Sequence, residues 1–292
     1  MGDPKLFKRA SIDASQADKW QRVTLPGPLS VATIGLAREL GYTQFPLQLP
    51  CELVWLKPPK FHSSEPPDSL LLAIHPGTGV FDALVEVTKS IKWPSLGLRL
   101  THGSLHGVES IAQLEQRYWE LVNQRVQLWR RQTDRRWLLG HSFGCRIAFS
   151  FASRFEFEVG CSSSIILMDG RIADQGFFVP QANDDAAHVL QDAVRAKHGS
   201  EAADNMDALG MLPIEGGGFD ARCRVLSDRV RVLYIESDEP MGLSRVRELA
   251  THIEVIHIEG SHVEALVRVS KGEEAHALAK HFELFLDQHV EC

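Results

Sequence analysis

One glycine-flanked serine limits the possible folds of this chain more than any other feature. Residues 137–148 read as a short apolar strand, a sharp turn over Gly-His-Ser-Phe-Gly at 140–144, and a helix. In this context the pattern is a nucleophile elbow, because glycine at both ends leaves room for the turn and the hydroxyl of Ser142 stands exposed at its tip. The amides that follow lie at a helix N-terminus, where N–H groups favour an anion. The alternative is an ordinary strand-to-helix loop with an exposed serine.

The rest of the chain alternates between strand and helix patterns. Continuous apolar runs are typical of parallel strands that are covered on both faces. The expected strands are 51–56, 70–74, 96–100, 137–139, 165–168, 230–235 and 253–258, and the expected helices lie within 80–91, 110–129, 143–151, 244–250 and 273–285. This alternation predicts an α/β fold with a mostly parallel central sheet and helices on both faces.

Several polar residues follow the carboxyl ends of the expected strands, where ligands bind in such sheets. These residues are His75, Ser142, Asp169, Asp238 and His262. We therefore expect all of them to open onto one edge of the sheet.

Length and composition fit one large α/β domain or two small ones. The chain has 292 residues, 44% hydrophobic and 24% charged, and a net charge of −7. Because the charge is negative and the basic residues are scattered, we expect no nucleic acid and no acidic membrane as partner. No apolar run has the length of a membrane span and the first residues lack a hydrophobic signal core, so we expect a cytoplasmic protein.

Cysteine and histidine spacing gives no sign of a metal site. The five cysteines form no C-x-x-C pair, which favours a reducing compartment over a disulfide framework or a zinc site. His102 and His106 have a spacing that binds metals on a helix, but Gly103 and Gly107 predict a loop there. We expect these two to be surface histidines, and we expect no metal.

A serine nucleophile needs a base, and the base needs an acid that orients it. His262 is the expected base, because it follows the last strand in the chain order serine, acid, histidine. Asp169 and Asp238 are both candidate acids, since each ends a strand of the same sheet. Asp169 is favoured because it stands alone after an apolar run, whereas Asp238 lies between two glutamates.

The oxyanion formed by serine attack needs two hydrogen-bond donors. One is expected to be the backbone N–H of Phe143, and the other to come from Gly77 or Thr78 in the glycine loop after the second strand. This loop lacks the lysine of a P-loop and the G-x-G-x-x-G spacing, so we do not expect a phosphate cradle. His75 either braces the loop by hydrogen bonding or only caps the strand, and His141 is expected to line a pocket wall.

Taken together, several short stretches carry a family resemblance. They are residues 72–79, Ser110-Ile111 with Tyr118, 138–144, 166–169 and 260–262. In these stretches the chain resembles the thioesterase domains that end polyketide synthases, non-ribosomal peptide synthetases and animal fatty acid synthases, and their stand-alone relatives. The resemblance covers about residues 70–285. It departs at Cys145, where the family often has a second glycine, and in the 68 leading residues, whose role it does not explain.

The resemblance implies an α/β-hydrolase domain over 69–292, with a helical lid at about 171–226 that covers an acyl channel. It implies a serine thioesterase that takes an acyl or peptidyl chain from the phosphopantetheine arm of a carrier protein. It also supports Asp169 as the acid, and it implies no metal or redox cofactor. Release by water or by an internal nucleophile both remain open, as does a free-standing protein or the end of a larger synthase.

Two other functions remain as alternatives. One is a different α/β-hydrolase, such as a carboxylesterase or a lipase-like acylhydrolase. The other is an inert module that binds a carrier protein, because fold does not dictate function.

Overall fold

A seven-stranded sheet forms the centre of the computed structural model, which describes residues 52–57, 70–126, 135–170, 185–213, 224–238, 242–269 and 272–288. The strand order is β1-β3-β2-β4-β5-β6-β7. All neighbouring strands run parallel except β1, which pairs antiparallel with β3 at one edge. The strands are β1 Leu53–Lys57, β2 Leu71–Ile74, β3 Ser95–Leu98, β4 Arg135–His141, β5 Ser162–Met168, β6 Leu226–Glu236 and β7 Ala250–His257. The predicted α/β fold with a mostly parallel sheet is confirmed.

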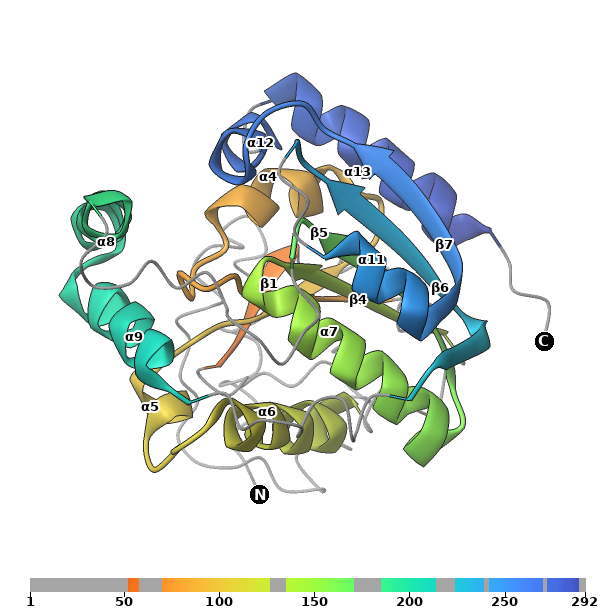
Figure 1. Ribbon diagram of the computed structural model, residues 1–292, viewed down its shortest axis with the longest axis horizontal. Coiled ribbons are helices and arrows are strands. Elements are labelled where there is room, and N and C mark those ends of the chain that lie inside the picture. The colour runs from red at the N-terminus through yellow and green to blue at the C-terminus, as the bar shows by residue number, and fades with distance from the viewer. Residues whose placement is uncertain are drawn as a thin grey trace, which may run out of the picture.

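Helices cover both faces of this sheet (Figure 1). The α-helices that the structure describes are α4 Asp82–Ser90, α5 His102–Leu105, α6 Ile111–Val126, α7 Phe143–Arg154, α8 Asp185–His198, α9 Ser200–Met211, α11 Leu243–Leu249, α12 His262–Val269 and α13 Gly272–Asp287. One apolar core lies between the sheet and α6, α7 and α11, and a second lies between the sheet and α4 and α13. The central strands β2, β4 and β5 are therefore buried on both faces, which explains their unbroken apolar runs.

The two helices α8 and α9 form an insertion between β5 and β6 (Figure 1). They pack on each other through a small cluster of Val194, Ala203 and Met206, and α9 also contacts α5. Both stand beside the sheet rather than on one of its faces. Val189 and Met211 are exposed on them, with 70% and 83% of their surface accessible.

The structure differs from the sequence expectations in two places. His102–Leu105 is a short helix and not a loop, because Thr101 and Ser104 form a reciprocal capping box that starts it. His102 and His106 are nevertheless exposed. A helix that was not expected, α12, begins at His262.

Parts of the sequence expectations lie outside the described residues. Of the leading segment 1–68, the structure describes only 52–57, and of the expected lid at 171–226 it describes 185–213 and 224–226. Among the helices that the structure describes, none combines the length and apolar character that a membrane crossing requires.

Candidate active site

Ser142 lies at a strained turn between β4 and α7. Its backbone has φ 51° and ψ −115°, and its N–H donates to the carbonyl of Met168 at 2.9 Å. Gly140 and Gly144 leave no space for a side chain, because a Cβ would lie 2.4 Å from the Gly144 carbonyl oxygen or 2.6 Å from that of Ile74. The two glycines therefore allow the close approach of α7 to β2 that the elbow requires.

Asp169 lies at a second strained turn, directly after β5. With φ 45° it is, beside Ser142, the other non-glycine residue with positive φ in the described part of the chain. A Cβ on Gly170 would lie 2.3 Å from the Ser142 carbonyl oxygen, so the two turns are packed backbone against backbone. Strain of this kind persists where the surrounding structure enforces it, and it gathers at functional sites.

The structure places His262 against Asp169. Nδ1 of His262 lies 2.7 Å from Oδ2 of Asp169, whose side chain is buried. An ionised carboxylate only accepts hydrogen bonds, so the proton lies on Nδ1 and Nε2 is left to take a proton from elsewhere. Burial acts to raise the pKa of Asp169, but the hydrogen bonds from His262 and Ser237 outweigh it and hold the pKa below its ordinary value.

His262 is the first residue of α12, and a capping box fixes this position. The N–H of Ser261 donates to Oε2 of Glu264 at 2.8 Å, and the N–H of Glu264 donates to Oγ of Ser261 at 3.4 Å. The S-x-x-E spacing at 261–264 was the sequence signal for this helix start. The expected helices did not include one at this position.

The other candidate acid, Asp238, contacts the loop that precedes His262. Its Oδ2 accepts the N–H of Gly260 at 2.6 Å, and its Oδ1 lies 2.9 Å from Nε2 of His257. Its side chain is 57% exposed, whereas that of Asp169 is 7% exposed. The N–H of Gly260 and then His257 hold the pKa of Asp238 below its ordinary value.

The glycine loop after β2 lies beside the start of α7. It is closed by a hydrogen bond from the N–H of Gly79 to the carbonyl of Pro76 at 2.9 Å, and a Cβ on Gly77 would lie 4.0 Å from the Cβ of Phe143. Gly77 and Thr78 are both half-buried in this turn. The loop therefore lies against the first residue of α7.

His75 connects this loop to α6. Its Nδ1 lies 2.7 Å from the carbonyl of Pro76 and its Nε2 lies 2.9 Å from the hydroxyl of Tyr118. Because a carbonyl only accepts, Nδ1–H donates to Pro76 and Nε2 accepts from Tyr118. Burial lowers the pKa of His75 to about 4, so the ring is neutral at pH 7. His75 therefore braces the loop, and its ring also stacks on Phe143 with 5.6 Å between centroids.

His141 stacks on the ring of His262, with 5.5 Å between centroids and 8° between planes. It is buried, and its Nδ1 has no hydrogen-bond partner among the described residues. Burial first, and then the nearby His262, lower its pKa to about 3. As expected, His141 lines a pocket wall, in a small cavity shared with Asp169, Ser237 and His262.

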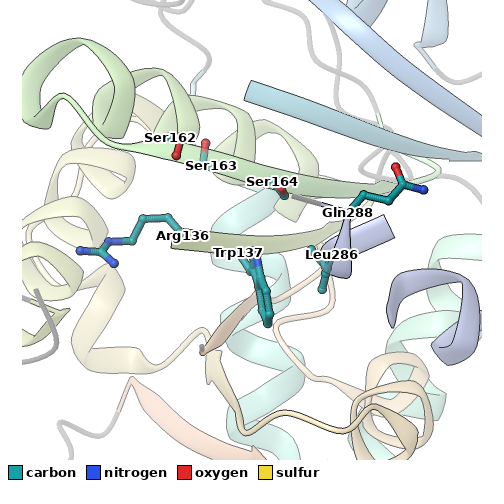
Figure 2. Close-up of a pocket in the computed structure, with 7 residues that line it drawn as sticks. All are labelled: Arg136, Trp137, Ser162, Ser163, Ser164, Leu286 and Gln288. Carbon is teal, nitrogen blue, oxygen red and sulfur yellow. The ribbon is translucent and has the colours of Figure 1, made fainter. Parts of the chain in front are cut away.

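A second cavity, of about 30 Å³, lies at the opposite edge of the sheet, where β4 and β5 begin (Figure 2). It is lined by Arg136, Trp137, Ser162, Ser163, Ser164, Leu286 and Gln288. The side chain of Arg136 extends away from the three serines, so the polar groups do not converge on one point. Within the described residues, no group of three or more His, Cys, Asp or Glu is placed to hold a metal ion.

Comparison with known proteins gives matches by structure. No protein-family model matches the sequence, and no curated protein matches it. The Vlm2 thioesterase domain, solved with a bound dodecadepsipeptide, is 16% identical, with a TM-score of 0.56 over 80% of this chain and 97% of that one. The NocB thioesterase domain, solved as a covalent complex with a fluorophosphonate nocardicin G analogue, is 18% identical, with a TM-score of 0.53 over 74% and 94%. The surfactin thioesterase domain SrfTE is 18% identical, with a TM-score of 0.51 over 75% and 91%.

The chain has the α/β-hydrolase fold of these thioesterase domains. The resemblance drawn from the short motifs is therefore confirmed at the level of the fold. At 16–18% identity the likeness carries no residue assignments, so the roles of Ser142, Asp169 and His262 rest on the geometry described above.

Proposed function

We propose that this chain is a serine thioesterase that releases an acyl or peptidyl chain from the phosphopantetheine thioester of a carrier protein. One observation carries the proposal: the 2.7 Å contact between His262 and Asp169, made beside the strained elbow of Ser142. A serine at such a turn with an oriented imidazole is the arrangement of an acyl-transfer enzyme.

In the first half-reaction Oγ of Ser142 attacks the thioester carbonyl while Nε2 of His262 takes the hydroxyl proton. The carbonyl oxygen becomes an oxyanion, which accepts hydrogen bonds from the N–H of Phe143 and from the N–H of Gly77 or Thr78. When the tetrahedral intermediate collapses, the C–S bond breaks. His262 then returns its proton to the departing thiolate, and the acyl group stays on Ser142.

In the second half-reaction His262 removes a proton from the group that attacks the acyl-serine. Water as the attacking group gives a free acid, and a hydroxyl or amine of the substrate itself gives a macrocycle. The structural neighbours include a domain solved with a depsipeptide and one described for cyclisation of a lipopeptide, and this supports chain release as the reaction class. These steps need no metal and no redox cofactor.

The α8–α9 insertion is our candidate for the lid over the acyl channel, within the expected lid segment at 171–226. It follows the strand that ends at Asp169, and α8 packs on α9 through a cluster of its own, while α9 joins the main core through Leu209. An insertion attached through one of its helices suits a movable cover. The free thiols Cys145 and Cys161 suit a reducing compartment, so we place the protein in the cytoplasm.

The experiment is intact-protein mass spectrometry after incubation with a fluorophosphonate, in parallel with a set of acyl-pantetheine thioesters. We expect one adduct on Ser142, acyl transfer from the thioesters, and a free acid or macrocycle as product. Ser142→Ala is the control and must show neither adduct nor turnover. A fluorophosphonate adduct on a protein that hydrolyses carboxylic esters but not the thioesters would favour a carboxylesterase. A folded protein that forms no adduct would favour an inert binding module.

A further inference from the structure

We propose that Ser237 and Asp238, the two residues after β6, hold Asp169 and His262 at the distance their hydrogen bond requires. We call this pair of residues the bracket. In this assignment Asp238 is a positioning residue for the catalytic histidine and not its acid. The inference rests on the proposed function, because it concerns how the same site is kept in order.

One arm of the bracket holds Asp169. The N–H of Asp169 donates to the carbonyl of Ile235 at 2.8 Å, and the N–H of Ser237 donates to Oδ1 of Asp169 at 3.4 Å. Ser237 is buried, with 2% of its surface accessible. The backbone and the carboxylate of Asp169 are therefore both tied to the end of β6, and its other oxygen, Oδ2, is directed at His262.

The other arm holds the loop that leads to His262. The N–H of Asp238 donates to the carbonyl of Gly260 at 2.9 Å, and the carboxylate of Asp238 accepts the N–H of Gly260 at 2.6 Å. Both polar backbone groups of Gly260 are thus bound by one residue. Gly260 has φ +108°, a conformation that favours glycine, and it lies two residues before His262.

This loop needs such an anchor because little packing holds it. Glu259 is exposed and Ser261 is half-buried, and β7 before the loop is an edge strand with mostly exposed side chains. A hydrogen bond from an N–H to an ionised carboxylate is stronger than one between neutral groups. The carboxylate of Asp238 is ionised across the neutral range, and the hydrogen bond from Gly260 lowers its pKa further, which suits this role.

Accurate placement of the loop matters for catalysis. A shift of about 1 Å at a catalytic group lowers the rate by roughly 100-fold. The contact between Nδ1 of His262 and Oδ2 of Asp169 depends on the relative position of two separate segments, and the bracket joins both segments within two consecutive residues.

The test compares Asp238→Asn with Asp238→Ala. The amide of Asn keeps an oxygen that accepts the N–H of Gly260, so we expect kcat within about fivefold of wild type. Ala removes the acceptor, and we expect kcat to fall roughly 10- to 100-fold with little change in KM, because the loop moves while the substrate site stays. Glu259→Ala, an exposed acid on the same loop, is the matched control and should behave as wild type. Thermal unfolding of each variant confirms that it is folded.

Two outcomes overturn the proposal. If Asn and Ala at position 238 both lower kcat on the order of 10⁴-fold, Asp238 is the catalytic acid. If Ala leaves kcat unchanged, Asp238 positions nothing.

A second measurement keeps this test apart from the proposed function. The low-field proton NMR signal of Nδ1–H in His262, bound to Asp169, needs no substrate. We expect it in wild type and in Asp238→Asn, and we expect it to be lost to solvent exchange in Asp238→Ala. If wild type lacks thioesterase activity but shows this pattern, the proposed function fails and the bracket stands. A signal that persists unchanged in Asp238→Ala refutes the bracket.

Discussion

Ser142 and Asp169 lie at the tight turns that follow β4 and β5, whereas His262 begins α12 directly after a partly exposed loop at the sheet edge. On the buried side, the positions of the backbone are set by contacts that leave no room for a Cβ on Gly140, Gly144 or Gly170. On the exposed side, the loop before His262 is held by hydrogen bonds to Asp238. The nucleophile and the acid are therefore fixed by packing, and the base is fixed by a few polar contacts. We therefore expect substitutions in the packed backbone of the buried side to lower the stability of the fold. Substitutions in the loop on the exposed side should lower mainly kcat.

The largest expected effect comes from breaking the hydrogen bond between Asp169 and His262, which joins the two sides. In Asp169→Asn the amide oxygen still accepts the N–H of Ser237, so the NH2 group faces Nδ1 of His262 and donates to it. This holds the proton on Nε2, the wrong tautomer for a base, and we expect kcat to fall on the order of 10⁴-fold. Steady-state kinetics with an acyl-pantetheine thioester measure the loss. Asp228→Asn, an exposed position on β6, is the control. Activity near wild type in Asp169→Asn would remove Asp169 from the site.

The next effect tests the packing of the buried side. Gly144→Ala places a Cβ 2.6 Å from the carbonyl oxygen of Ile74 and 2.7 Å from that of His75, and neither backbone segment can yield easily. We expect a loss of about 1–3 kcal/mol in the free energy of unfolding, together with lower activity. Urea unfolding followed by circular dichroism measures it.

Gly103→Ala is the matched control for this substitution. Its Cβ would lie 3.5 Å from the nearest atom, an ordinary contact. We expect its stability to stay within about 1 kcal/mol of wild type. Equal stability of the two variants would show that the elbow has more room than its geometry indicates.

Sequence patterns were sufficient for the sheet and the elbow, because both depend on local periodicity and on glycine at fixed spacing. The choice between Asp169 and Asp238 was harder, since each follows a strand and the two strands are neighbours. Only the three-dimensional structure shows that the carboxylate of Asp169 faces His262 and that of Asp238 faces Gly260. These directions depend on long-range contacts, and the sequence around either residue does not encode them.

The short helix α5 and the start of α12 show the same limit on a smaller scale. Glycine suggested a loop at α5, and no helix was expected at α12, but a capping box starts each helix. The two boxes were visible as Thr-x-x-Ser at 101–104 and Ser-x-x-Glu at 261–264. Capping signals therefore deserve more weight than a single glycine when a helix start lies next to a candidate catalytic residue.

A smaller effect is expected farther from the reacting groups, at Tyr118 in α6. Tyr118→Phe removes the hydroxyl that donates to Nε2 of His75 and leaves this buried nitrogen without that bond. We expect a loss of about 1–3 kcal/mol in stability and a moderate loss of kcat, because His75 braces the loop of Gly77 and Thr78. Urea unfolding and kinetics on one preparation measure both. A change in neither would mean that the loop keeps its shape without His75.

The smallest effect at neutral pH is expected where the two sides touch, at the stacked rings of His141 and His262. His141 has a pKa of about 3 in the folded protein and about 6.5 when unfolded, so between these values the unfolded chain binds more protons. This group therefore contributes stability at neutral pH that is lost as the pH falls from about 6.5 towards 3. His141→Phe keeps a ring against His262 but cannot titrate, so its stability should fall less steeply with acid, while kcat at pH 7 stays within about fivefold. The free energy of unfolding of both proteins is measured by urea titration at several pH values. If it falls equally steeply with acid in the two proteins, His141 is already charged, or already exposed, in the folded state.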